Sequence, residues 1–155
     1  MLTSTRKRVR RTSGGRIAIV ASLYNQEFVD GMLAAAEKIL ENAGVSAVEV
    51  HRVPGSYEIP VMAAALARRK ARRPEAIICF GLIWQGETTH AQHIGEAVSF
   101  ALMDLAIDSG VPVIHQVLTV SSHDQAKARC LDSETNRGAE GAHTALAMVA
   151  ALRGA

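Results

Sequence analysis

The chain has 155 residues, of which 48% are hydrophobic and 21% charged, and this composition is typical of one globular domain with its own core. No apolar run approaches the roughly 18 residues of a membrane span, and the first residues lack the apolar segment of a secretory signal. The two cysteines, Cys79 and Cys130, provide neither a disulfide framework nor a zinc pattern. We therefore expect a protein of the reducing cytoplasm, in which Cys79 packs as a small hydrophobic residue.

The formal net charge of +2 hides an asymmetry between the first residues and the rest of the chain. Residues 1–15 hold five of the 17 basic side chains and no acidic one, which leaves 12 basic against 15 acidic groups, or −3, for the remainder. We expect residues 1–15 to form a disordered basic tail ahead of a single domain over residues 16–155. The tail is either a solvated segment or an electrostatic contact for nucleic acid or another polyanion. No aromatic residues interleave with its charges, so base stacking is not indicated.

Strands and helices alternate along the rest of the chain. Apolar runs predict strands over residues 17–21, 45–53, 76–80 and 111–118. Helical spacing predicts helices over residues 28–43, 60–71, 89–109, 124–129 and 136–152, the first followed by Gly44 as its C′ residue. This alternation indicates an α/β fold with a four-stranded parallel sheet flanked by helices on both faces.

Three distinctive turns follow the first three predicted strands. They are Leu23–Asn25, Pro54–Glu58 and Gly81–His90. Because ligands of open parallel sheets bind beyond the carboxyl ends of the strands, we expect all three turns to face one crevice. Neither a Gly-x-Gly-x-x-Gly fingerprint nor a Walker A loop is present, so binding of a dinucleotide or a nucleoside triphosphate is not indicated.

His90 stands where the third turn enters the next helix, beside Thr88 and Thr89. Backbone N–H groups at a helix start can bind a phosphate, and histidine exchanges a proton near neutral pH. We interpret His90 as a proton-transfer residue; the alternative is a helix cap or a hydrogen-bonded core histidine. Glu87 and His93 lie three residues to either side and do not share one helix face with His90, so a metal site is not favoured.

Three more side chains have both a functional and a structural interpretation. Arg129 is either a phosphate-binding guanidinium or a surface cation near a helix C-terminus. Glu58 is either a ligand contact or an acid favoured by a helix N-terminus. Tyr24 is either a core aromatic or a surface on which a flat heterocycle stacks.

Several segments together resemble the 6,7-dimethyl-8-ribityllumazine synthase family, in order and spacing, over roughly residues 16–152. The combination of Val53–Pro60 with Gly86–His90 is highly specific. The matching segments are Leu23-Tyr24-Asn25, Val53-Pro54-Gly55-Ser56-Tyr57-Glu58-Ile59-Pro60, Gly86-Glu87-Thr88-Thr89-His90, Leu118-Thr119, Gln125-Ala126-x-x-Arg129 and Asn136-Arg137-Gly138.

The resemblance implies a flavodoxin-like three-layer sandwich and the penultimate step of riboflavin synthesis. In that reaction, 5-amino-6-(D-ribitylamino)uracil condenses with 3,4-dihydroxy-2-butanone 4-phosphate, and phosphate and water leave. The family uses neither a metal nor a redox cofactor. The alternative is a paralogue that binds a lumazine or flavin, or builds a shell, without turnover.

The resemblance also assigns roles to individual positions. His90 corresponds to the proton-transfer histidine, and Arg129 to the phosphate-binding arginine, supported by backbone N–H groups at Glu87 and Thr88. Further substrate-binding positions are Tyr24, which stacks on the pyrimidine, and Asn25 beside it; Ser56, Tyr57 and Glu58, which hold the ribityl chain and ring; and Ile83 and Trp84, whose backbone contacts the uracil. His115 and Arg137 complete the expected substrate-binding set.

Other positions depart from the usual family pattern. Trp84-Gln85-Gly86 stands where the family commonly has Ile-Arg-Gly, and Arg137 where it usually has lysine. His115 stands where the family often has a phenylalanine that reaches the pocket of the neighbouring subunit. Family members assemble as pentamers, decamers or hollow shells of twelve pentamers with active sites between subunits, so the resemblance implies that an isolated protomer is inactive.

Overall fold

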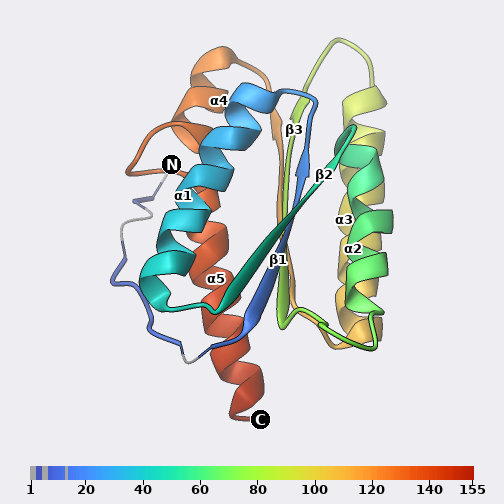
Figure 1. Cartoon of the computed structure of the whole chain (residues 1–155). Coiled ribbons are helices and arrows are strands. Elements are labelled where there is room, and N and C mark those ends of the chain that lie inside the picture. The colour runs from blue at the N-terminus through green and yellow to red at the C-terminus, as the bar shows by residue number, and fades with distance from the viewer. Residues whose placement is uncertain (1–2, 5–6, 13) are drawn as a thin grey trace.

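Four parallel strands form the central layer of the protein, and helices cover both faces of the sheet (Figure 1). The structure is a computed structural model that describes residues 3–4, 7–12 and 14–155. Its elements in chain order are β1 (Arg16–Ser22), α1 (Gln26–Ala43), β2 (Ala47–Val53), the 3-10 helix η1 (Ser56–Glu58), α2 (Ile59–Ala67), β3 (Ala76–Trp84), α3 (His90–Ser109), β4 (Val113–Val120), α4 (His123–Cys130) and α5 (Arg137–Arg153).

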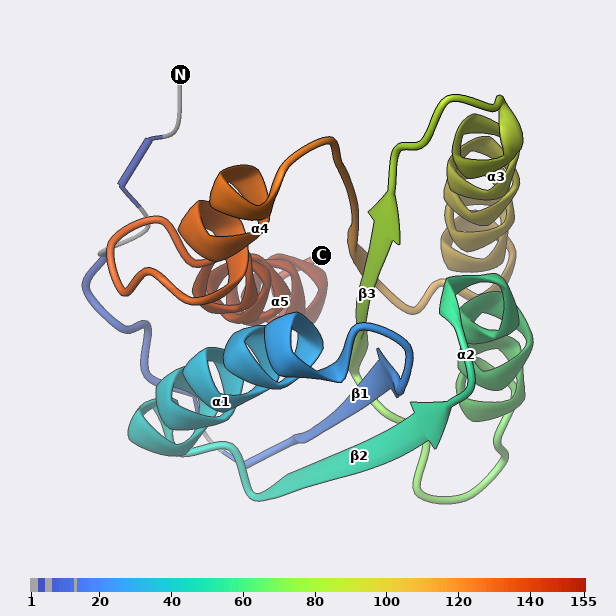
Figure 2. The ribbon, with the colours of Figure 1, turned by 90° about the horizontal axis from the view of Figure 1, so that it is seen from above.

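The strand order is β2-β1-β3-β4, so the chain leaves β1 toward one side of the sheet and returns to build the other side. Helices α1, α4 and α5 form one outer layer, and α2 and α3 form the other, as the view from above shows (Figure 2). This arrangement confirms the predicted three-layer α/β sandwich with a four-stranded parallel sheet, the flavodoxin-like architecture. The reversal of strand order between β1 and β3 marks the place where such sheets bind ligands.

The sheet separates two hydrophobic clusters because successive side chains of a strand point to opposite faces. In β1, Ile17 and Ile19 pack toward α1, α4 and α5, whereas Ala18 and Val20 pack toward α2 and α3. All four side chains are buried. A strand buried on both faces reads as an unbroken apolar run, which explains why the sequence pattern located β1 and the start of β3 so closely.

Both cysteines are free and buried, Cys79 in β3 and Cys130 at the end of α4. Burial raises the pKa of the Cys79 thiol. Burial also raises the pKa of Cys130 to about 12, against the opposing effect of the nearby Arg129. Cys79 therefore packs as a small hydrophobic residue, as predicted.

The third strand is longer than the sequence predicted. The run over residues 76–80 was expected to end at Gly81, but β3 continues to Trp84. A Cβ atom at position 81 would lie 2.5 Å from Ser56 Oγ, so glycine is needed for close packing of Ser56 against the strand. The turn that leads to His90 thus begins after Trp84.

The helix predicted over residues 60–71 was extended too far, because α2 ends at Ala67. The Arg73 Nε–H donates to the Ala67 carbonyl at 2.7 Å and so takes the acceptor that a further helical turn would use. Pro74 also disfavours helical backbone at Arg73. The cations of residues 68–73 consequently follow the helix instead of lying in its last turn.

The remaining boundaries differ from the predictions by at most two residues. The strand predicted over residues 111–118 is β4, Val113–Val120; it begins after Pro112, which has no N–H group to donate. Gly44 adopts the left-handed conformation after α1, with φ of 86°, as its predicted C′ position requires. Asn136 caps α5 from outside the helix by accepting from the Gly138 N–H at 2.8 Å.

The described part of the predicted tail contacts the body of the protein. Val9 packs against the cluster beneath α1, and the Thr12 N–H donates to the Ala43 carbonyl at 2.9 Å. Residues 1–2, 5–6 and 13 lie outside the described residues. Disorder of the tail and its contact with a polyanion stay predictions.

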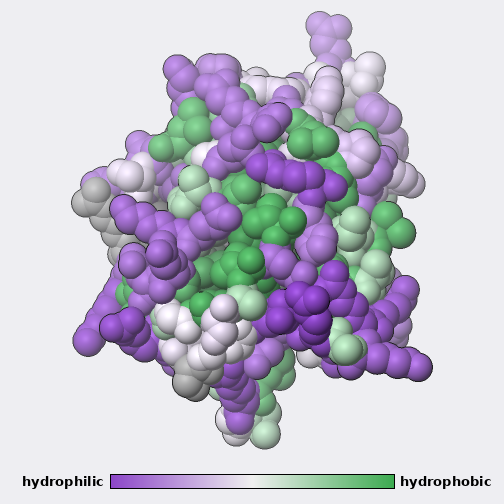
Figure 3. All heavy atoms as spheres, viewed as in Figure 1, coloured by the Kyte–Doolittle hydropathy of each residue, from purple (hydrophilic) through white to green (hydrophobic). Residues whose placement is uncertain are grey.

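Hydrophobic side chains reach the surface in several places. Figure 3 shows hydrophobic surface in the middle of the face viewed in Figure 1, ringed by hydrophilic side chains. On α3, Phe100, Met103 and Ile107 recur at helical spacing and are between 61% and 74% exposed. Within the described ranges, no helix combines the length and the apolarity that crossing a membrane requires.

Helix α1 lies very close to α5 and to the end of α4, at one glycine in each contact. A Cβ atom on Gly138 would lie 1.9 Å from the Met32 carbonyl oxygen, and one on Gly31 would lie 2.5 Å from the Cys130 carbonyl oxygen. The Asn136 side chain joins the same segments by donating to the carbonyl groups of Gly31 and Cys130. This contact fixes α5 and the loop before it against α1.

We predict that Gly138→Ala lowers the free energy of unfolding by about 3 kcal/mol or more, because the added methyl group meets backbone that cannot rotate away. Gly95→Ala is the matched control in α3. Its Cβ would lie 3.4 Å from Thr119 Oγ1, and a helical alanine should stabilise by about 0.5–1 kcal/mol. Denaturant unfolding at one protein concentration measures the unfolding free energy of both variants. Equal unfolding free energies for the two variants would contradict the close approach of Gly138 to α1.

Candidate active site

A cavity of about 500 Å³ lies at the carboxyl ends of β1, β2 and β3. The three turns that the sequence predicted to face one crevice all contribute to its lining. Nine of the thirteen predicted site residues line it, namely Tyr24, Asn25, Ser56, Tyr57, Glu58, Ile83, Trp84, Thr88 and His90. The fold thus collects side chains that are up to 66 positions apart, and their roles in binding stay predictions.

A hydrogen bond joins the side chains of Asn25 and Trp84, which both line the cavity. Asn25 adopts a left-handed conformation with φ of 59°, which asparagine tolerates better than most residues. Its Nδ2 donates to the Leu82 carbonyl at 2.7 Å, and its Oδ1 accepts from the Trp84 Nε1–H at 2.9 Å. The turn after β1 is therefore locked to the end of β3.

Ser56 and Glu58 shape the floor of the cavity. Ser56 is buried against Gly81. One carboxylate oxygen of Glu58 accepts from the Gly55 N–H at 3.0 Å and so closes its own turn. The second carboxylate oxygen has no hydrogen-bond partner among the described residues, and Glu58 still lines the cavity.

The two tyrosines present their rings at the mouth of the cavity. Tyr24 is 72% exposed and Tyr57 is 64% exposed. The core interpretation of Tyr24 is therefore wrong. Exposed rings beside a cavity are available to stack on a flat heterocycle.

His90 is the first residue of α3, and the cavity lining continues along that helix to Ala91 and Ile94. Sequence reasoning missed these two residues. Ile94 lies four positions after His90 and so shares its helix face, a spacing that could have identified it. The free N–H groups of the first turn of α3 also lie at this rim.

Four predicted site residues lie outside this cavity. Glu87 is exposed in the turn before α3. Arg129, on α4, donates from Nη1 to the Gln125 carbonyl at 3.3 Å. Arg137, at the start of α5, forms an ion pair with Glu140. The fourth, His115, lies on β4. A single protomer therefore does not bring Arg129 and His90 into one cavity.

His115 has both ring nitrogens engaged. The Val117 N–H donates to Nδ1 at 3.1 Å, and Ser99 Oγ lies 2.8 Å from Nε2. Ser99 in turn donates to the Gly95 carbonyl at 2.7 Å. Because Nδ1 is an acceptor here, we assign the proton of the neutral ring to Nε2, from which it is donated to Ser99. Burial lowers the pKa of His115, which also favours the neutral ring.

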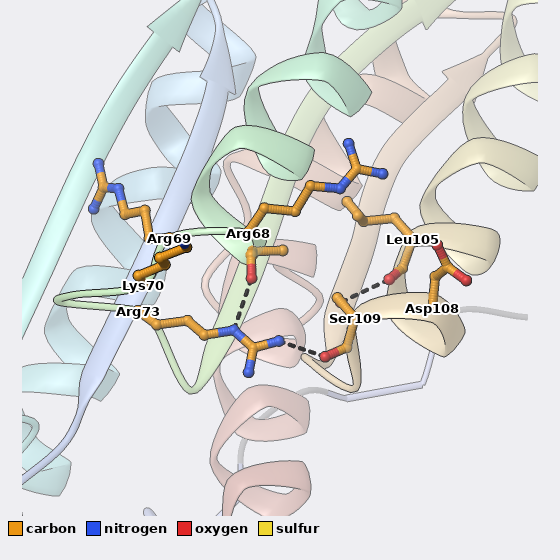
Figure 4. Close-up of a pocket in the computed structure, with 8 residues that line it drawn as sticks. Arg68, Arg69, Lys70, Arg73, Leu105, Asp108 and Ser109 are labelled. Atoms are coloured by element: carbon orange, nitrogen blue, oxygen red, sulfur yellow. Dashed lines mark hydrogen bonds between the residues drawn. The ribbon is translucent and has the colours of Figure 1, made fainter.

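A second hollow, of about 460 Å³, lies near the C-terminal ends of α2 and α3 (Figure 4). Basic side chains surround it, but they serve other contacts or point apart. Arg73 donates to the carbonyl groups of Ala67 and Ser109, and Arg69 forms an ion pair with Glu49. Figure 4 shows the guanidinium group of Arg68 directed away from that of Arg69. These cations do not converge on one ligand, so the cavity beside His90 is the candidate site.

Metal binding finds no support in the part of the chain that the structure describes. No group of three or more His, Cys, Asp or Glu side chains there is placed to hold a metal ion. The groups of the cavity lining that can bind a ligand or transfer a proton are His90, polar side chains and backbone groups.

Comparison with known proteins agrees with these motifs. The chain matches the 6,7-dimethyl-8-ribityllumazine synthase family over residues 14–153. It is 40% identical to 6,7-dimethyl-8-ribityllumazine synthase of Kineococcus radiotolerans over 92% of this chain and 88% of that protein. It is 39% identical to the protein of the same name from Xylella fastidiosa, over 92% of each chain, and 39% identical to 6,7-dimethyl-8-ribityllumazine synthase 1 of Caulobacter vibrioides, over 89% of this chain and 90% of that protein. The chain belongs to the 6,7-dimethyl-8-ribityllumazine synthase family.

Proposed function

We propose that this protein condenses 5-amino-6-(D-ribitylamino)uracil with 3,4-dihydroxy-2-butanone 4-phosphate to 6,7-dimethyl-8-ribityllumazine, with the reaction centred on the cavity beside His90. Family membership supports the reaction. The assignment of the site rests on one observation: the three turns that match the family motifs all line one cavity. Nothing in the comparisons supports a non-catalytic paralogue. Since both cysteines are free, we place the protein in the reducing cytoplasm.

The chemistry calls for proton transfer more than for a strong nucleophile. The amine attacks the ketone carbonyl to form a carbinolamine, which loses water to give an imine. Elimination then releases phosphate, and the second nitrogen closes the ring with loss of water. His90 at the rim of the cavity is the group that gives and takes protons in these steps. Holding both substrates in one cavity supplies much of the remaining acceleration.

The pyrimidine substrate is assigned to the cavity itself. Tyr24 offers an exposed ring for stacking, and Ser56, Tyr57 and Glu58 offer polar groups for the ribityl chain. The free carboxylate oxygen of Glu58 is the acceptor best placed for a hydroxyl group.

We assign Arg129, His115 and Arg137 to the cavity of an adjoining protomer. In one chain all three lie outside the cavity that holds His90. Exposed hydrophobic side chains on α3, which a monomer would leave in water, support self-association. The resemblance to the family implies the form of assembly, so we propose pentamers with active sites between subunits, alone or assembled into decamers or shells.

Replacing His90 with alanine should lower kcat by about 10²-fold or more, because general acid–base catalysis is lost. Arg129→Ala should weaken turnover by about 30-fold or more through poorer binding of the phosphorylated ketone. Lys127→Ala is the control, because it removes an exposed cation from the same helix. Phosphate release measures all three; unchanged rates for both His90→Ala and Arg129→Ala would refute the site.

Mixed oligomers test whether the site lies between subunits. His90→Ala and Arg129→Ala proteins, dissociated and reassembled together in equal amounts, should recover about a quarter of wild-type activity, because a quarter of the interfaces then pair an intact His90 with an intact Arg129. Each variant reassembled alone should keep only its own low activity. No recovery on mixing would mean that both residues act within one chain.

The neutral state of His115 predicts a pH effect on stability. Its folded pKa is below the unfolded value of about 6.5, so the folded protein binds fewer protons and loses stability as pH falls below that value. His115→Phe should flatten the decline of the unfolding free energy between about pH 7 and 5. Burial and the positive charge of Lys7 also lower the pKa of His143. The variant therefore keeps part of the pH dependence of the unfolding free energy. A slope equal to that of the wild type would contradict the assignment.

A further inference from the structure

Trp84 lies in an aromatic cluster that the reaction assigned above does not use. Its indole is 37% exposed, lines the cavity and is bonded through Nε1–H to Asn25. Behind it, the ring of Phe28 meets the indole edge to face, with centroids 5.8 Å apart and planes at 79°. The indole is thus fixed at one edge by an amide and supported by a buried ring.

His123, the first residue of α4, completes the cluster. Its ring is parallel to the indole, with an interplanar angle of 0° and centroids 6.3 Å apart, and it also meets Phe28 edge to face at 5.2 Å. Stacked and edge-to-face geometries at these distances are the favourable arrangements for ring pairs. His123 does not line the cavity, so any effect on substrate must pass through Trp84.

The position of His123 is also fixed by its own helix, α4. Ser122 caps α4 by accepting from the Gln125 N–H at 3.2 Å, which fixes the backbone at the point where His123 leaves it. The stack therefore joins the start of α4 to the end of β3, two segments that otherwise belong to a helix layer and to the sheet.

From this geometry we propose that His123 is a positioning residue. It holds the Trp84 indole as a rigid wall of the cavity and thereby sets the affinity for the planar pyrimidine substrate. The phosphorylated ketone has no ring to place against this wall. The proposal rests on the function assigned above and adds to it a side-chain role for Trp84 and a residue outside the cavity.

The test uses His123→Ala in the full-length protein. Loss of one ring contact should raise KM for the pyrimidine about threefold to tenfold and leave kcat and KM for the ketone phosphate nearly unchanged. Trp84 is the only tryptophan of the chain, so its fluorescence reports the stack directly. The emission should move to longer wavelength, because the uncovered indole face meets water.

Two variants separate positioning from a general effect on folding. His123→Phe keeps a flat ring and should restore the wild-type KM for the pyrimidine. His93→Ala removes an exposed imidazole from α3, outside the cavity lining, and should change neither KM nor emission. Thermal unfolding of each variant shows that the compared proteins are folded.

The two claims fail separately. A wild-type protein that releases no phosphate from the two substrates contradicts the proposed function. An active wild type contradicts the role of His123 if His123→Ala leaves pyrimidine KM and emission unchanged. The role is equally contradicted if the KM change falls on the ketone phosphate, or if His123→Phe behaves like His123→Ala.

Discussion

Parallel pairing of β1 with both β2 and β3 is the constraint on which the site depends. It places the carboxyl ends of three strands at one edge of the sheet, so the turns that follow them must meet there. Residues distant in sequence then form direct contacts, as Asn25 does with Trp84. The close approach of α1 and α5 at Gly138 joins two helices of the layer that covers one face of the sheet.

Local patterns in the sequence were sufficient for most of the fold. The unbroken apolar run of β1 identified a buried strand, and Gly44 marked the end of α1. The two larger errors have a common cause. Strand β3 continues past Gly81 because its residues pair with β4 as far as Trp84, and α2 stops at Ala67 because the Arg73 side chain occupies its last carbonyl. Both are tertiary contacts, which a local pattern does not contain.

The same distinction separates the predictable part of the site from the rest. The turns around Tyr24, Glu58 and His90 have distinctive sequences that follow predicted strands, and all three line one cavity as predicted. The stack of His123 on Trp84 depends on how α4 returns to the sheet and has no local signal. Arg129 and His90 lie apart in one protomer because α4 and α3 belong to opposite helix layers, which no local pattern in the sequence reports.

The most direct measurement is an experimental structure of the assembled protein with a substrate-like pyrimidine and inorganic phosphate bound. The account predicts the pyrimidine ring in the cavity against Tyr24, with His90 within hydrogen-bond reach of the reacting nitrogen. It predicts the phosphate between the start of α3 and Arg129 of an adjoining subunit. A ring bound elsewhere, or a phosphate distant from every Arg129 in the assembly, would contradict the account.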